Sequence, residues 1–286
     1  MTDPRRTISF QGRPGAYSDL ACRNAYPGWT TLPCDTFELA MEAVRAGRAE
    51  LAMMPTENSL AGRVPDMHHL LPESGLFVVA EAFQRVEHCL LALKGTTIEG
   101  LKRAHSHPVA LGQVRTILRD LNLTPIVEQD TAGSAELVAQ WGNPEDCAIA
   151  SSLAGELFGL EVLRANVEDA AHNTTRFYVM SRQKRASRPE EAGLMTTFVF
   201  RVRNVPAALY KALGGFATNG INMTKLESYM VGGHFSATQF LCDVEGHPEQ
   251  PALRRALEEL TFFSRETRIM GVYPAAQFRK DQASGD

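Results

Sequence analysis

The first part of the chain alternates short apolar runs with amphipathic segments that begin at capping residues. Asp35 and Thr36 can cap a helix that ends near Gly47, and a largely apolar strand is predicted over residues 50–54. The strand leads directly into a polar cluster, Pro-Thr-Glu-Asn-Ser, at residues 55–59. A helix followed by a strand that ends in polar side chains is therefore one unit of the predicted fold.

The same arrangement recurs further along the chain. Asp130 opens a helix that runs through Trp141 and stops at Gly142, and the apolar strand 147–150 is followed by serines at 151–152. Alternating strands and helices favour parallel sheets whose carboxyl ends face a crevice. Two such units predict an α/β protein with two lobes that close on a small ligand.

A polar segment, SRQKRASRPEEAG at residues 181–193, separates this region from a second periodic region, and we expect the domain boundary there. Beyond it, the pattern predicts the order βαββαβ of a ferredoxin-like domain. The predicted strands span 196–203, 221–230, 235–244 and 267–273, and the predicted helices span 206–218 and 251–263.

Composition excludes several classes of protein. The chain has 286 residues, of which 44% are hydrophobic and 22% charged, and no run approaches the roughly 20 apolar residues that span a bilayer. Residues 1–6 lead directly into the strand-like segment 7–10, without the apolar region of an export signal. The five cysteines form no Cys-x-x-Cys pair, which fits reduced thiols. We therefore expect a cytoplasmic protein.

The charge pattern and the histidines argue against other partners. With a net charge of -4 and no dense block of Lys and Arg, the chain lacks the electrostatic footprint of a nucleic-acid binder. Six histidines occur in the first region, but none forms a ligand pair on a predicted helix. No serine lies in a Gly-x-Ser-x-Gly elbow, and Cys89 lies in an apolar run. We expect no metal, no cofactor and no nucleophilic hydrolase chemistry.

Two polar clusters are the main candidates for a site. Residues 173–177, Asn-Thr-Thr-Arg-Phe, bring an amide, hydroxyls and a guanidinium to the end of a predicted loop, and we expect them to share a cleft with residues 55–59. A purely structural interpretation of each cluster stays open. Residues 57–59 can cap a helix that begins near Leu60, and Arg176 can form a structural salt bridge instead of binding a carboxylate.

The loop Gly12–Ser18 follows a predicted strand and precedes a predicted helix with Ser18 as its cap. Backbone N–H groups at such a turn can hold a carboxylate, although the loop can equally be an ordinary turn.

Together with Ser106-His107-Pro108 and Gln113, these clusters resemble prephenate dehydratase over nearly the whole chain. The resemblance implies a catalytic domain over residues 1–183 with the two-lobed, type II periplasmic-binding-protein-like fold. Lobe 1 would comprise about 1–80 and 160–183, and lobe 2 about 81–159. Residues 220–228 resemble an ACT domain, which implies a regulatory domain over 194–276.

Prephenate loses its ring carboxylate as carbon dioxide while its hydroxyl leaves as water, so the enzyme needs a proton donor at one end of the substrate only. The resemblance assigns this role to Thr175, the threonine before Arg-Phe. Its proton would be replaced through Glu57 or water, or Glu57 would donate the proton in its place. The substrate-binding residues it implies are Gly15, Ala16, Ser18, Asn58, Ser59, Ser106, Gln113, Asn173, Thr174, Arg176 and Phe177.

ACT domains commonly bind amino acids across dimer interfaces, so the resemblance implies a homo-oligomer, dimer or tetramer, with L-phenylalanine as effector. The expected effector-binding residues are Ala207, Ala208, Leu209, Asn222, Met223, Thr224, Glu227 and Ser228. Many relatives carry Gly-Ala-Leu and Glu-Ser-Arg-Pro where this chain has Ala207-Ala208-Leu209 and Glu227-Ser228-Tyr229-Met230. An ACT domain that only dimerises is the alternative.

The sequence thus predicts a prephenate dehydratase that makes phenylpyruvate for L-phenylalanine biosynthesis. Two alternatives stay open at this point. Arogenate dehydratase removes the same groups from an amino analogue of prephenate, and a two-lobed amino-acid sensor would bind its ligand without reaction.

Overall fold

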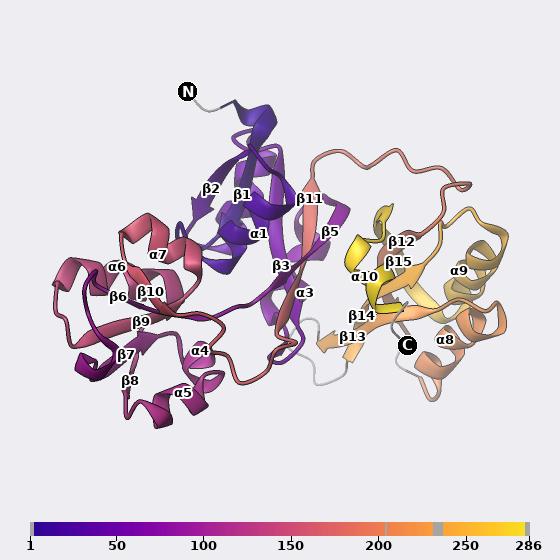
Figure 1. Ribbon diagram of the computed structural model, residues 1–286. Coiled ribbons are helices and arrows are strands. Elements are labelled where there is room, and N and C mark those ends of the chain that lie inside the picture. The colour runs from indigo at the N-terminus through magenta and orange to yellow at the C-terminus, as the bar shows by residue number, and fades with distance from the viewer. Residues whose placement is uncertain (1–2, 204, 231–236, 284–286) are drawn as a thin grey trace. The chain divides into compact units, whose positions relative to one another are not determined.

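The computed structural model describes residues 3–203, 205–230 and 237–283, which form three β-sheets with helices around them (Figure 1). The chain divides into two compact units: Met1–Val64 with Ala82–Phe177, and Pro65–Glu81 with Tyr178–Asp286. This division differs from the predicted domains, because residues 65–81 and 178–183 group with the second unit.

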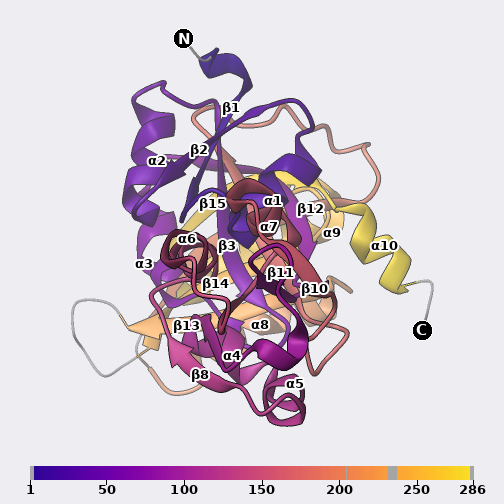
Figure 2. The same ribbon diagram turned by 60° about the vertical axis from the view of Figure 1, so that its left-hand side comes forward.

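The first sheet has the strand order β2-β1-β3-β11-β5, with the short β4 beside β3. Strand β1 pairs in parallel with both β2 and β3, as alternating strands and helices predict. Helix α2 packs against β1 and β2 (Figure 2). The elements of this part are η1 (Pro4–Arg6), β1 (Thr7–Gln11), α1 (Tyr17–Ala25), β2 (Thr30–Cys34), α2 (Phe37–Arg45), β3 (Leu51–Asn58), β4 (Gly62–Arg63), α3 (Pro65–Glu73), β5 (Phe77–Arg85) and β11 (Thr174–Ser181).

The second sheet has the order β10-β6-β9-β7-β8. Because β10 pairs with β6, this sheet continues beyond residue 159, where the second lobe was expected to end. Its elements are β6 (Cys89–Ala92), η2 (Ile98–Gly100), β7 (Arg103–Ser106), α4 (Pro108–Gly112), α5 (Arg115–Asp120), β8 (Thr124–Val127), α6 (Thr131–Trp141), β9 (Asp146–Ala150), α7 (Ser152–Phe158) and β10 (Glu161–Arg164).

Both faces of the second sheet are buried. Leu90 and Ile149 belong to a core that includes residues of α4 and α5, whereas their neighbours Leu91 and Ala148 belong to a core that includes residues of α6 and α7. Figure 1 shows these two helix pairs on opposite sides of the sheet. Successive strand residues alternate between the two cores, which explains why these strands read as unbroken apolar runs.

The capping residues explain where several helices begin and end. As predicted, Thr36 caps α2 by accepting from the N–H of Leu39, and Asp130 caps α6 by accepting from the N–H of Gly133. Gly142 ends α6 in the left-handed conformation, at φ 62°. The expectation for Ser18 was wrong: the N-cap of α1 is Ala16, and no side chain caps that helix.

The alternative interpretation of residues 57–59, as the cap of a helix near Leu60, is wrong, because β3 continues through Asn58 and turns tightly into β4. The next helix, α3, begins at Pro65.

The third sheet confirms the predicted βαββαβ order, and its strand order β13-β14-β12-β15 is that of a ferredoxin-like domain. Helices α8 and α9 share a core with β12 and β14, built around Phe198, Phe216 and Leu253. The start of the predicted strand 235–244 lies outside the described residues. The elements are β12 (Leu194–Val202), α8 (Ala208–Thr218), β13 (Met223–Met230), β14 (Ala237–Glu245), α9 (Pro251–Phe263), β15 (Ser264–Pro274) and α10 (Gln277–Ala283).

All five cysteines are unpaired, and only Cys34, at the end of β2, is partly exposed. Burial raises the pKa of the buried thiols, that of Cys147 to about 12. In the part of the chain that the structure describes, no helix has the length and apolar content needed to cross a membrane.

Candidate active site

The structure brings the two predicted polar clusters together, because β3 and β11 are neighbours in the first sheet. The N–H of Ser59 donates to the carbonyl of Thr174 over 2.9 Å. The Ser59 hydroxyl accepts from the N–H of Thr174 and donates to the carbonyl of His172. Ser59 and Thr174 therefore join the ends of the two strands, and the N–H and hydroxyl of Ser59 are occupied within the chain.

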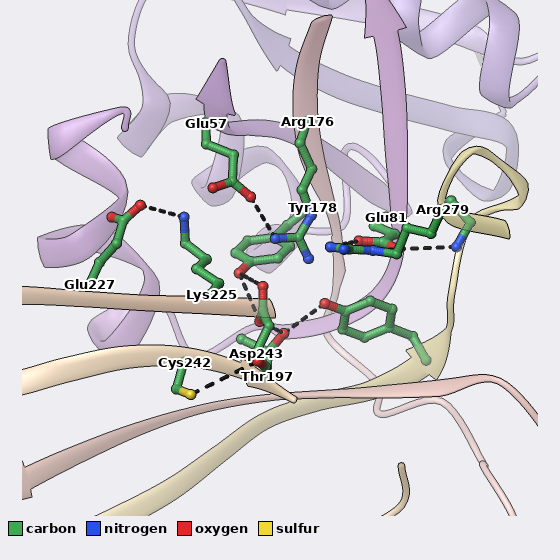
Figure 3. A network of polar contacts seen from close by, with 12 residues as sticks. Glu57, Glu81, Arg176, Tyr178, Thr197, Lys225, Glu227, Cys242, Asp243 and Arg279 are labelled. Carbon is green, nitrogen blue, oxygen red and sulfur yellow. Dashed lines mark hydrogen bonds and ion pairs between the residues drawn. The ribbon is translucent and has the colours of Figure 1, made fainter. Parts of the chain in front are cut away.

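Strand alternation divides the clusters between the two faces of the sheet. On one face, Asn58 Nδ2 donates to Thr175 Oγ1 over 3.0 Å. On the other, Arg176 Nη1 lies 2.7 Å from Glu57 Oε1 (Figure 3). Arg176 is buried, whereas about a third of the Glu57 side chain (32%) is exposed. Neighbouring strand residues point in opposite directions, so Glu57 and Thr175 do not share a face.

A pocket of about 330 Å³ opens on the Thr175 side of the first compact unit. Most of its wall is apolar, with a few polar groups that converge on it, which is the composition typical of a small-molecule site. The lining residues are Tyr17, Asn58, Ala61, Val64, Val86, His88, His107, Val109, Ala110, Gln113, Asp130, Thr131 and Thr175.

Asn173 connects the two sides of this pocket. Its side chain is fully buried, and its Oδ1 accepts from Asn58 Nδ2 over 2.8 Å. Its Nδ2 donates to Gln113 Oε1 over 2.9 Å. Gln113 follows α4 of the second sheet, so the amide of Asn173 links side chains of both lobes within this unit.

Tyr17 and His88 also line the pocket and were not among the expected site residues. The Tyr17 hydroxyl lies 2.8 Å from His88 Nδ1, and His88 Nε2 lies 3.0 Å from Gln113 Oε1. Burial lowers the pKa of His88 and raises that of Tyr17 well above its ordinary value. His88 directly precedes a buried apolar strand, and a polar residue at that boundary was the available sequence signal.

The loop before α1 does not present the expected backbone donor at Gly15. The N–H of Gly15 donates to Asp19 Oδ2 over 2.9 Å, and its carbonyl accepts from the hydroxyl of Ser151. Ala16 packs against the core beneath α6 and α7, and Ser18 lies inside α1. The carboxylate that this turn holds is therefore one of the chain's own.

Two more expected substrate contacts lie away from the pocket. Ser106 is fully buried and donates its hydroxyl proton to the carbonyl of Ile149 over 2.6 Å, so the expectation that it points into the crevice was wrong. Phe177 is 1% exposed and is part of the core.

In the second unit, several expected effector residues have partners within that unit. Glu227 lies 2.6 Å from the buried ammonium of Lys225 (Figure 3). It also contacts His68. Burial acts to raise the pKa of Glu227, but the hydrogen bonds and charges of His68 and Lys225 lower it to about 2. Asn222 donates to Glu245, and Ala207 adopts the left-handed conformation, at φ 62°.

A second pocket of about 330 Å³ lies in this unit, and none of the expected effector residues lines it. Tyr229 and Met230, at the end of β13, are part of its wall. The lining residues are His68, His69, Pro72, Glu73, Val199, Phe200, Arg201, Tyr229, Met230, Gln239, Glu266 and Arg268.

The first unit is a two-lobed α/β unit in which two neighbouring strands end in polar residues beside an apolar pocket. A ferredoxin-like unit follows it. This architecture is that of an enzyme that acts on a small molecule and carries a C-terminal accessory domain. The family model of prephenate dehydratase matches residues 8–185. The chain belongs to the prephenate dehydratase family, whose members are lyases that act on prephenate.

Three relatives illustrate the range of the family. A "bifunctional N-acyl-homoserine lactone acylase/prephenate dehydratase" of Komagataeibacter europaeus is 66% identical over 275 residues, which cover 96% of this chain and 98% of the relative. The "arogenate dehydratase/prephenate dehydratase 1" of Arabidopsis thaliana is 35% identical, over 95% of this chain and 73% of the relative. The solved prephenate dehydratase of Arthrobacter aurescens in complex with L-Phe is 29% identical, with a TM-score of 0.84 over 98% of both chains.

The pairing of Glu57 with buried Arg176 predicts a structural effect of Glu57→Gln. Removing the carboxylate charge leaves a buried guanidinium with a weaker partner, so the free energy of unfolding falls by about 2 kcal/mol. Urea unfolding measures this loss. Glu42→Gln, in the exposed pair of Glu42 with Arg45, is the matched control and changes stability by no more than about 0.5 kcal/mol. Equal stability of the Glu57→Gln variant and the wild type would contradict the structural role.

Proposed function

We propose that the first pocket is the active site of a prephenate dehydratase that converts prephenate to phenylpyruvate, carbon dioxide and water in L-phenylalanine biosynthesis. The observation that carries the proposal is the position of Thr175, whose hydroxyl is held by Asn58 at the wall of a largely apolar pocket. Membership of the family supplies the substrate class. We place the enzyme in the cytoplasm as a homo-oligomer, and the reaction needs no cofactor.

The reaction requires one bond to break at each end of the substrate ring. The carbon–carbon bond to the ring carboxylate breaks and carbon dioxide leaves, and its electron pair enters the ring. The carbon–oxygen bond at the opposite carbon breaks, and the departing hydroxyl takes one proton to become water. Thr175 Oγ1 donates a hydrogen bond to the departing hydroxyl and supplies this proton. Solvent then restores the proton of Thr175. An oriented donor in a pocket that excludes water is worth far more than the same donor in bulk water.

Glu57 does not serve as the proton donor in this proposal. Its carboxylate lies on the opposite face of the sheet and pairs with Arg176. Glu57 therefore supports the strand that carries Thr175.

Replacing Thr175 tests the assignment of the donor. Thr175→Ala lowers kcat for phenylpyruvate formation by about 10²-fold to 10³-fold, the usual cost of one lost transition-state donor. Thr175→Ser keeps a hydroxyl and retains much of the activity. Ultraviolet absorbance of phenylpyruvate follows both rates. Full activity of Thr175→Ala, with an inactive Glu57→Gln of normal stability, would refute the assignment.

Arogenate in a parallel reaction separates the two dehydratases, and binding without turnover would indicate a sensor.

We also propose that the C-terminal unit is an ACT domain that senses L-phenylalanine. Its βαββαβ order and the L-Phe complex of the Arthrobacter aurescens relative support the proposal. Adding L-phenylalanine lowers the rate of prephenate turnover, and D-phenylalanine is the matched control. An unchanged rate would favour the alternative, a domain that only dimerises.

A second activity, cleavage of N-acyl-homoserine lactones, is a further candidate. The relative that carries it in its name is 66% identical over almost its whole length, and the apolar wall formed by residues such as Val64, Val86 and Val109 can accommodate an acyl chain. Incubation with an N-acyl-homoserine lactone then releases homoserine lactone and a fatty acid, which mass spectrometry detects. Prephenate inhibits this release if both substrates use the first pocket. No release by enzyme that turns over prephenate would eliminate the second activity.

A further inference from the structure

The side-chain amide of Asn58 has an orientation that the backbone imposes. Its Oδ1 accepts from the N–H groups of Leu60 and Ala61, over 2.9 Å and 2.8 Å. A peptide N–H can only donate, so the oxygen of this amide must face the turn between β3 and β4. Its Nδ2 therefore faces Asn173 and Thr175 and donates to both.

This orientation determines the next two amides. Asn173 Oδ1 accepts from Asn58, so Asn173 Nδ2 is the group that donates to Gln113 Oε1. Because the oxygen of the Gln113 side chain accepts from Asn173, its Nε2 is the group that can donate. Gln113 lines the pocket.

The same oxygen determines the tautomer of His88. Because Gln113 Oε1 can only accept, His88 Nε2 must carry a hydrogen. Burial lowers the pKa of His88, so the ring is neutral near pH 7 and its Nδ1 has a lone pair. The Tyr17 hydroxyl lies 2.8 Å from this nitrogen and 3.0 Å from the carbonyl oxygen of Glu87, so its single hydrogen is shared between these two acceptors.

We propose that Tyr17 and His88 are positioning residues that, through Gln113, Asn173 and Asn58, hold Thr175 as a hydrogen-bond donor to the substrate. Thr175 Oγ1 already accepts from Asn58, so its own hydrogen is left to point elsewhere, and the pocket lies beside it. The same chain presents the Nε2 hydrogens of Gln113. Two donors thus face a substrate that has a departing hydroxyl and carboxylate groups. This inference rests on the proposed dehydratase function.

Removing the Tyr17 hydroxyl disturbs the chain at the end farthest from Thr175. In Tyr17→Phe, His88 Nδ1 becomes a buried acceptor with no hydrogen bond from Tyr17, so the ring is no longer held at both nitrogens. The ring then holds Gln113 Oε1 less firmly through its Nε2 hydrogen. The positions of Gln113 and Asn173, and through Asn58 that of Thr175, become less well defined.

The first experiment combines kinetics with ¹⁵N NMR of the histidines. Tyr17→Phe lowers kcat for prephenate about 10-fold to 100-fold with a smaller change in KM. The matched control, Tyr26→Phe, makes the same chemical change at the end of α1, away from the pocket, and retains wild-type kcat. Wild-type His88 shows the neutral ring with hydrogen on Nε2, and Tyr17→Phe keeps this tautomer but shifts the Nδ1 resonance, because that nitrogen loses its hydrogen-bond donor. Wild-type kcat in Tyr17→Phe, or hydrogen on Nδ1 in the wild type, overturns the proposal.

The second experiment reverses the direction of the bond to Thr175. Aspartate at position 58 has the shape of asparagine but can only accept, so in Asn58→Asp the Thr175 hydroxyl donates to it and not to the substrate. kcat then falls about as far as in Thr175→Ala, by ~10²-fold to 10³-fold, although Thr175 is present. Retained activity in a folded Asn58→Asp variant contradicts the proposal. Absence of turnover by the wild type would refute the dehydratase function instead. In that case the tautomer of His88, measured by NMR, still tests the chain of hydrogen bonds.

Discussion

The pairing of β3 with β11 is the constraint on which the candidate site depends. Each strand contributes two consecutive polar residues at its end, and the two-residue repeat of a β-strand sends them to opposite faces. The ionic pair of Glu57 and Arg176 therefore lies on one face, and the neutral pair of Asn58 and Thr175 on the other. A shift of one residue in this pairing would exchange the two faces and turn charges toward the apolar pocket.

The side of the sheet that faces the pocket relies on neutral hydrogen-bonding groups. A buried amide with all its partners costs little, whereas a buried charge requires a counter-charge and still loses hydration. Asn173 illustrates the first case, because both ends of its fully buried amide are occupied. Arg176 illustrates the second, with Glu57 as its counter-charge. Such a pocket can bind a substrate carboxylate through donors without neutralising it by a full positive charge.

Sequence patterns predicted the elements better than the contacts of individual side chains. Apolar runs, caps such as Thr36 and Asp130, and the βαββαβ order depend on residues close together in the chain, and the structure has them where they were expected. Side-chain direction depends on partners far away. Ser106 donates to a carbonyl 43 residues distant, and no local pattern distinguishes it from a serine that faces a pocket.

The residues that line the first pocket show the same limit of prediction from local sequence patterns. Gln113 and Thr175 were predicted to contribute to the site from the family pattern, and both line the pocket. Tyr17 and His88 were missed because their contact joins residues 71 positions apart. Conversely, Gly15 has an occupied backbone N–H because Asp19, one helical turn later, reaches back to it.

The burial of four thiols has a practical consequence for spectroscopy. A maleimide reacts with a thiolate, and burial disfavours that form at Cys22, Cys89, Cys147 and Cys242. Cys34 is the partly exposed exception: burial raises the pKa of its thiol as well, but the thiol can be reached from solvent. Its carbonyl accepts from the N–H of Gly12 at the start of the loop before α1. A fluorophore attached there would report on that loop in the native sequence, without any cysteine being engineered in or out.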